Sequence, residues 1–93
     1  MVAKNINDKL RRQLARLAND AATATGRKAA TALRKMANKA GLRVESGGKH
    51  FRVIDSETGR SVTRIPRSPH AKPTIEAIAR AIMNAAENEG DFE

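Results

Sequence analysis

The residues best suited to chemistry surround a single histidine, in the run Gly47-Gly48-Lys49-His50-Phe51-Arg52-Val53. Imidazole ionises near neutral pH, so a neutral His50 could take a proton from a hydroxyl group. Consecutive glycines let a polyanion approach the backbone closely, and Lys49 and Arg52 add positive charge. The run therefore predicts an anion site at Gly48, Lys49 and Arg52, with a general base between them. The alternative is a hairpin turn followed by an ordinary surface histidine.

A second basic segment, Ile65-Pro66-Arg67-Ser68-Pro69-His70-Ala71-Lys72-Pro73, leads into a helix. Helix N-termini bind phosphate through free backbone N–H groups and the helix dipole. If the segment lies near His50, we expect three cations to bind phosphate. They are Arg67 and Lys72 within the segment and Arg64 just before it. His70 could supply a general acid only if the loop folds over His50; otherwise it is a polar loop residue.

The first element that must position these groups is an N-terminal helix. Apolar residues recur at helical spacing at Leu10, Leu14, Leu17 and Ala21. This spacing places one apolar stripe along the helix, and Asn5 or Asn7 is expected to cap its start. The stripe is either core or a contact with a second copy of the chain.

A second helix is predicted over residues 27–39. Gly26 weakens a helix interior, so the first helix should break before it, and Thr25 is expected to cap the second. Gly41 then supplies a left-handed stop. A single long helix through Gly26 is the alternative.

Beyond Gly41 the apolar period changes from helical to alternating, which is typical of strands. Strands are expected over residues 42–45, 49–54 and 60–65. A Ser46-Gly47-Gly48 turn and a polar loop over residues 55–59 join them, and such short connections favour an antiparallel meander. The prolines after Ile65 end the sheet, and a last helix begins at Thr74 or nearby. The fold class is therefore α+β, with helices covering one face of a three-stranded antiparallel sheet.

Size and composition restrict the class of protein. With 93 residues the chain forms one domain, and without cysteine it has no disulfide framework or thiolate metal site. With only two histidines in the chain, we expect neither a metal nor a cofactor. No apolar run approaches the length of a membrane span or a secretory signal, so we expect a cytoplasmic protein that does not bind membranes.

Charge indicates the partner. Eighteen Lys and Arg against ten acids give a net charge of +8. Only six of the acids precede residue 87, so residues 1–86 carry +12. Charge of this sign and size attracts polyanions, which favours nucleic acid as the partner. The alternative is a basic surface that only keeps the protein in solution.

These features resemble the HicA toxins, which are small mRNA interferases with a fold like double-stranded-RNA-binding domains. Gly48-Lys49-His50 lies where that family has a Gly-Ser-His motif at a strand start, with Lys49 in place of serine. Arg64-Ile65-Pro66 and Lys72-Pro73-Thr74 resemble the family's Val-Pro, basic loop and Lys-Pro-Gly-Thr helix start. The resemblance implies an α-β-β-β-α domain over residues 26–88, preceded by a helical extension at 1–25 and followed by an acidic tail at 89–93.

The same resemblance implies an activity and a partner. His50 would be the catalytic residue of a metal-independent endoribonuclease that inhibits translation and growth, and a HicB-like antitoxin would neutralise it. In that chemistry a ribose 2′-hydroxyl loses its proton to His50 and attacks the adjacent phosphate, while the surrounding cations stabilise the developing charge.

Two other functions fit the same residues. The first is a non-catalytic RNA- or DNA-binding protein on the same scaffold, which grips phosphates largely by shape. The second is a small protein-interaction inhibitor, or a homodimer, that uses the N-terminal helix.

Overall fold

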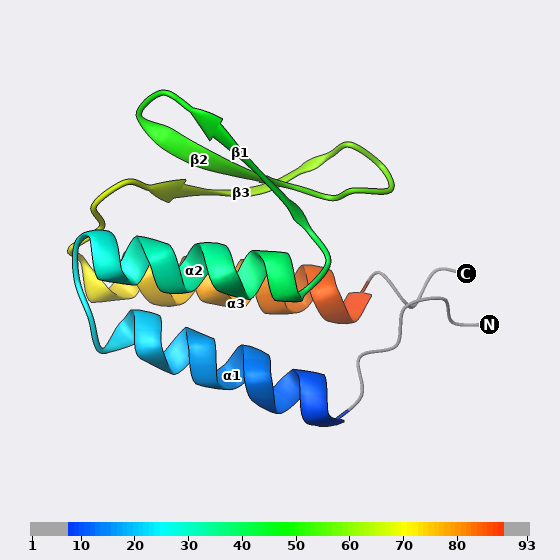
Figure 1. Ribbon diagram of the computed structural model, residues 1–93, viewed down its shortest axis with the longest axis horizontal. Coiled ribbons are helices and arrows are strands. Elements are labelled where there is room, and N and C mark those ends of the chain that lie inside the picture. The colour runs from blue at the N-terminus through cyan, green and yellow to red at the C-terminus, as the bar shows by residue number, and fades with distance from the viewer. Residues whose placement is uncertain (1–7, 89–93) are drawn as a thin grey trace.

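The computed structural model describes residues 8–88, which form three layers (Figure 1). The elements in chain order are α1 (Asp8–Ala22), α2 (Arg27–Lys39), β1 (Arg43–Gly47), β2 (His50–Ile54), β3 (Ser61–Pro66) and α3 (Lys72–Asn88). The sheet packs on α2 and α3, and α1 packs on the other side of that helix pair. The predicted α+β class and antiparallel meander are confirmed, with sheet order β1-β2-β3 and one face left open. The expected caps Asn5 and Asn7 and the acidic tail lie outside the described residues.

The break between α1 and α2 is at the predicted place, so residues 8–39 form two helices. Gly26 is the N-cap of α2 with φ of 68°, a region that glycine reaches without steric cost. Its N–H donates to the carbonyl of Pro69 at 2.7 Å. The prediction of Thr25 as cap is therefore wrong by one residue, because the chain reverses through positive φ where threonine would be strained.

The end of α2 is a Schellman motif, which confirms the predicted stop at Gly41. Gly41 has φ of 86°, and its N–H donates to the carbonyl of Asn38 at 3.0 Å. The N–H of Leu42 donates to the carbonyl of Ala37 at 3.0 Å. Together these bonds satisfy carbonyls that the helix end would leave free. Leu42, which is 4% exposed, then leads the chain from the helix into the sheet.

Each strand begins one residue later than predicted; β1 ends two residues later and β3 one residue later, whereas β2 ends at Ile54 as predicted. Gly47 belongs to β1 and pairs with His50, so the turn consists of Gly48 and Lys49 alone. Gly48 has φ of 82°, which a two-residue hairpin turn requires. Pro66 ends β3 opposite His50 instead of lying beyond the sheet. A proline is tolerated there because β3 is an edge strand.

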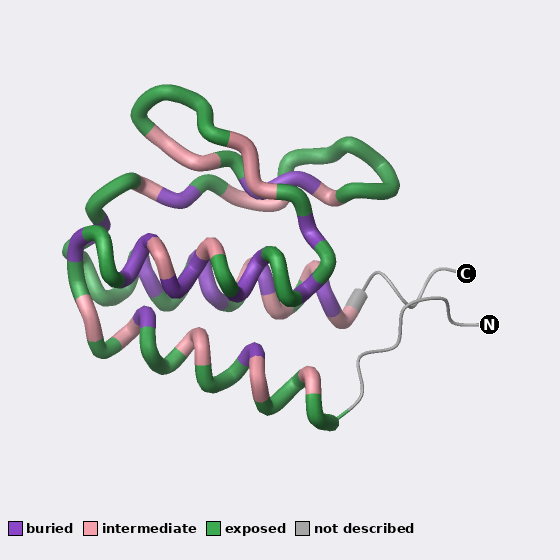
Figure 2. The backbone as a smooth tube through the Cα atoms, viewed as in Figure 1, coloured by how far each residue is buried: buried purple, intermediate pink, exposed green. Residues whose placement is uncertain are grey.

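The core lies where the layers meet (Figure 2). Since α2 lies between α1 and the sheet, it is buried on more than one side, and small side chains allow this close packing. Its buried residues are Ala29, Ala30, Ala32, Leu33, Met36 and Ala37. Leu14 and Ala21 of α1 are both 0% exposed, so the N-terminal stripe packs into the same core. None of the helices within residues 8–88 combines the length and the apolar character that crossing a bilayer requires.

Candidate nucleic-acid interface

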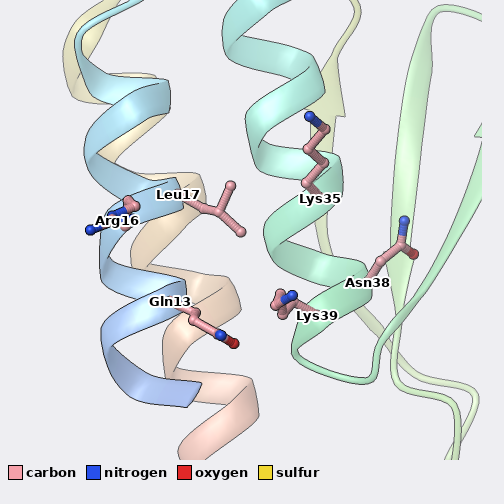
Figure 3. Close-up of a pocket in the computed structure, with 6 residues that line it drawn as sticks. All are labelled: Gln13, Arg16, Leu17, Lys35, Asn38 and Lys39. Carbon is pink, nitrogen blue, oxygen red and sulfur yellow. The ribbon is translucent and has the colours of Figure 1, made fainter. Parts of the chain in front are cut away.

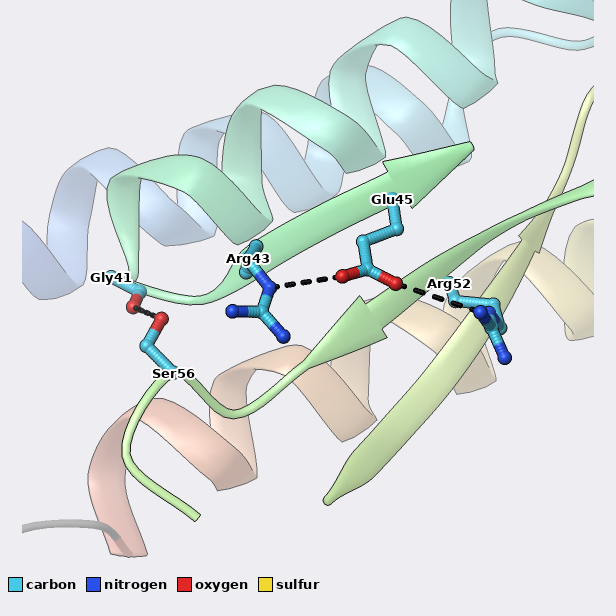
Figure 4. Close-up of polar contacts among 5 residues, drawn as sticks. All are labelled: Gly41, Arg43, Glu45, Arg52 and Ser56. Carbon is cyan, nitrogen blue, oxygen red and sulfur yellow. Dashed lines mark hydrogen bonds and ion pairs between the residues drawn. The ribbon is translucent and has the colours of Figure 1, made fainter. Parts of the chain in front are cut away.

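The open face of the sheet carries part of the predicted site. Strand register and the alternation of side chains place these residues on it: Arg43, Glu45, His50, Arg52 and Arg64. Glu45 lies between two arginines, 3.1 Å from Arg43 Nε and 3.5 Å from Arg52 Nη2 (Figure 4). An anion at Arg52 would therefore compete with Glu45, which makes Arg52 a weaker phosphate ligand than its sequence position indicates.

His50 begins β2 and is partly buried. Its cross-strand partners are Gly47 and Pro66, and Arg52 lies two residues along on the same face. Among residues 8–88, no hydrogen bond or ion pair involves the imidazole. A general base is usually held by a third group that orients it, and the described part of the chain supplies none for His50.

The basic loop after β3 does reach the glycine turn, as the sequence suggested. Arg67 Nε donates to the carbonyl of Gly48, and Arg67 Nη2 donates to Ser46 Oγ at 2.8 Å. The same guanidinium lies against the Phe51 ring, 4.5 Å from its centroid. These three contacts fix Arg67 at the edge of the sheet, beside the turn that holds Lys49.

The rest of the loop turns toward the helices. His70 Cε1 lies 3.7 Å from the position that a β-carbon on Gly26 would occupy. His70 is therefore placed at the start of α2, on the covered side of the sheet, whereas His50 belongs to the open face. Lys72 is exposed at the start of α3, and no hydrogen bond or ion pair within residues 8–88 links it to the other predicted site residues.

The largest hollow on the molecule's helical side lies between α1 and α2 (Figure 3). It measures about 540 Å³ and is lined by Gln13, Arg16, Leu17, Lys35, Asn38 and Lys39. Leu17 points from α1 toward α2 and supplies the apolar floor. A second hollow, of about 270 Å³, shares Leu17 and Lys35 with it and continues to Arg27, Lys28 and Thr31.

A third hollow, the Phe51 pocket, lies where α2 meets the sheet. It measures about 420 Å³ and is lined by Arg27, Ala30, Thr31, Arg34, Phe51, Arg67 and Ser68. Because it shares Arg27 and Thr31 with the second hollow, the three form one track along α2. We call this track the cationic groove. It leads from Lys39 to the glycine turn beside Arg67.

Charge in the groove is one-sided. Among the described residues that line it, seven are cationic and only Asp20 is acidic. Sequence reasoning singled out Arg67 but missed the six cations on the helices: Arg16, Arg27, Lys28, Arg34, Lys35 and Lys39. One signal was available, because Lys28, Lys35 and Lys39 are spaced by seven and four residues and so share one face of a helix.

Comparison with known proteins gives no relative. No protein-family model matches the chain, and neither a curated protein nor a solved structure matches it. The interface is therefore argued from its own residues.

Proposed function

We propose that this protein binds RNA through the cationic groove. The observation that carries the proposal is the uneven charge of the helices. Residues of α1 and α2 include nine cations and two acids, whereas α3 has two of each. A continuous row of Lys and Arg neutralises successive phosphates and releases their counterions, and this is the main source of affinity for nucleic acid.

The scaffold is consistent with recognition of structured RNA. From α2 onward the order is α-β-β-β-α with both helices on one face, and we propose that this part is a domain like the double-stranded-RNA-binding domains. Such domains read the shape and phosphates of RNA more than its sequence. Phe51, the sole aromatic side chain within residues 8–88, lies between arginines, so stacking of several bases is not expected. RNA of the cytoplasm is the expected ligand.

The proposal is tested by retention of a labelled structured RNA. Wild-type protein should bind at low salt and release the RNA as salt rises. Arg16→Gln with Lys35→Gln removes two charges from the groove and should weaken binding about tenfold or more. Arg80→Gln with Lys72→Gln removes two charges from α3 and is the matched control, expected to stay within about threefold. Equal losses in the two pairs would reject the groove as the binding surface.

RNA cleavage is a second candidate function, favoured by the place of His50. Its imidazole is partly exposed on the open face, with Arg52 on the same strand and Arg64 on the neighbouring strand β3. We propose that it takes the proton of a ribose 2′-hydroxyl, whose oxygen bonds to the adjacent phosphorus as the bond from phosphorus to the 5′-oxygen of the next nucleotide breaks; water supplies the proton to that leaving oxygen. A single general base accelerates a reaction roughly 10²- to 10⁴-fold, so slow RNA cleavage is expected. A HicB-like antitoxin would be the expected partner of such an activity.

One variant, His50→Ala, distinguishes RNA cleavage from RNA binding without cleavage. His50→Ala should abolish RNA cleavage and growth arrest while leaving retention of RNA unchanged, because the groove lies on the other side of the sheet. A folded His50→Ala protein that still cleaves RNA would reject the catalytic role. A wild-type protein that retains RNA intact would leave RNA binding as the function.

A further inference from the structure

We propose that the Phe51 pocket is a binding site for one phosphate group. The inference rests on the proposed function, because the phosphate would belong to bound RNA, either within the strand or at its end. Three arginines line the pocket, from the start of α2, from its middle and from the loop after β3. No acidic side chain lines it among the described residues.

The arginines of this pocket differ from Arg43 and Arg52 of the open sheet face in having no ion pair within the described residues. Arg43 and Arg52 share the one carboxylate of Glu45. Within residues 8–88, neither Arg27, Arg34 nor Arg67 contacts a carboxylate. Cations gathered without counter-charge repel one another, and an anion between them relieves that repulsion.

Two of the three guanidinium groups are held in place before any ligand arrives. Arg34 and Arg67 each lie 4.5 Å from the centroid of the Phe51 ring. Arg67 is fixed further through Ser46 and the Gly48 carbonyl, and those bonds use Nε and Nη2. Its Nη1 has no hydrogen-bond partner within the described residues. Ligand binding therefore costs little side-chain entropy, and planar guanidinium forks suit phosphate oxygens.

Arg34 supplies an independent observation that points to an anion. Its Nη2 donates to Thr31 Oγ1 at 3.3 Å, but its Nε is buried with no hydrogen-bond partner. A buried charged group normally requires compensation by hydrogen bonds or opposite charge. Phosphate in the pocket would compensate the guanidinium, while the hydroxyls of Thr31 and Ser68 line the same space as donors to its oxygens.

The pocket is tested first with inorganic phosphate, at ionic strength held constant with chloride. We expect saturable changes in the NMR signals of the backbone amides of residues 27–31 and of Ser68. Arg34→Gln and Arg27→Gln should each weaken this binding about tenfold or more. Arg60→Gln removes the same charge from the distal hairpin loop and should change it less than twofold. Arg27 is exposed, and its side chain forms no hydrogen bond or ion pair within the described residues, so its variant stays informative if Arg34→Gln unfolds.

A second arm identifies the source of the phosphate with one RNA oligonucleotide, made with and without a 5′-phosphate. Tighter binding of the phosphorylated form that disappears in Arg27→Gln identifies a terminal phosphate. Equal weakening of both forms by Arg27→Gln identifies an internal one. If neither form is weakened, or if phosphate gives no saturable change, the pocket is not a phosphate site, even where RNA binds elsewhere. If the protein binds inorganic phosphate but does not retain RNA, the proposed function is rejected, and the pocket remains a phosphate-binding site.

Discussion

Phe51 is the residue at which the sheet and the cationic groove meet. Its ring is partly buried and packs against the core, and it also receives the guanidinium groups of Arg34 and Arg67. Each cation–π contact contributes about 0.5 to 1 kcal/mol at an exposed site and more when desolvated. The ring therefore does two things: it closes one end of the core, and it fixes the spacing of two cations from distant parts of the chain.

Replacing Phe51 by leucine should remove the support of the two arginines while keeping an apolar side chain in the core. Leucine keeps an apolar side chain but offers no aromatic face, so we expect a loss of about 1–2 kcal/mol in the free energy of unfolding. Affinity for RNA should also fall several-fold, because both arginines lose their support. Urea unfolding and RNA retention measure the two effects.

Val62→Ala is the control for Phe51→Leu. Val62 is a half-buried residue of β3 that packs against the core, and it is not among the residues that line the cationic groove. Its replacement should lower stability yet leave RNA affinity unchanged. RNA binding by Phe51→Leu at the wild-type level would show that the arginines do not depend on the ring.

At the scale of elements, α2 organises the molecule. One side packs on the sheet, another on α1, and its exposed residues supply most of the cations of the groove. Alanine on the buried sides of α2 lets the neighbouring layers approach closely, while lysine and arginine occupy its more exposed positions. A single helix thus serves as both core and binding surface.

Local sequence was enough to predict the elements. Periodicity located α2 at residues 27–39, and Gly41 predicted its stop, because both depend on neighbouring residues alone. The turn at Gly48-Lys49 and the cap at Gly26 were each misplaced by a residue, because both depend on which glycine takes positive φ. That choice is set by strand register and by the contact between Gly26 and the loop at Pro69, which no local pattern records.

The candidate site could be predicted only where it is contiguous. Arg67 was a phosphate-binding candidate on the condition that its loop lies near His50, and its bonds to Ser46 and the Gly48 carbonyl place it beside the glycine turn. The groove requires Arg16 of α1 and Lys35 of α2 to line the same hollow, and this depends on how two helices pack. The sequence left open whether α1 packs on this domain at all.

That question leads to a prediction for α1 as an element of the core. Leu14 is 0% exposed between α1 and the α2–α3 pair, so Leu14→Ala should cost about 3 kcal/mol of unfolding free energy, within the 2–5 kcal/mol typical of buried leucines. Leu17 is half-buried at the groove, so Leu17→Ala should lower the free energy of unfolding clearly less than Leu14→Ala. Urea unfolding should remain a single transition in both. A Leu14→Ala protein as stable as wild type, or one that unfolds in two steps, would mean that α1 is not part of the same cooperative unit.

Considered as a whole, the molecule distributes its charge unevenly among its helices. The groove follows α1 and α2, whereas the charges of α3 cancel. Electrostatic attraction should therefore orient the protein as it approaches a polyanion, with α2 foremost. The same asymmetry limits how many phosphates can be contacted at once.

This limit gives a prediction that depends on the length of the RNA. With 13 residues at a rise of 1.5 Å, α2 is about 20 Å long, which matches roughly six phosphates of one strand. Affinity for short duplex RNA should rise up to about six nucleotides per strand and then level off. With seven cations in the groove, the slope of log K against log salt should be no steeper than about −6, and Lys35→Gln should reduce it by about 0.7 to 0.9. A steeper slope, or affinity that keeps rising well beyond ten nucleotides, would show that phosphates are also bound outside the groove, with the arginines of the open sheet face as the next surface to examine.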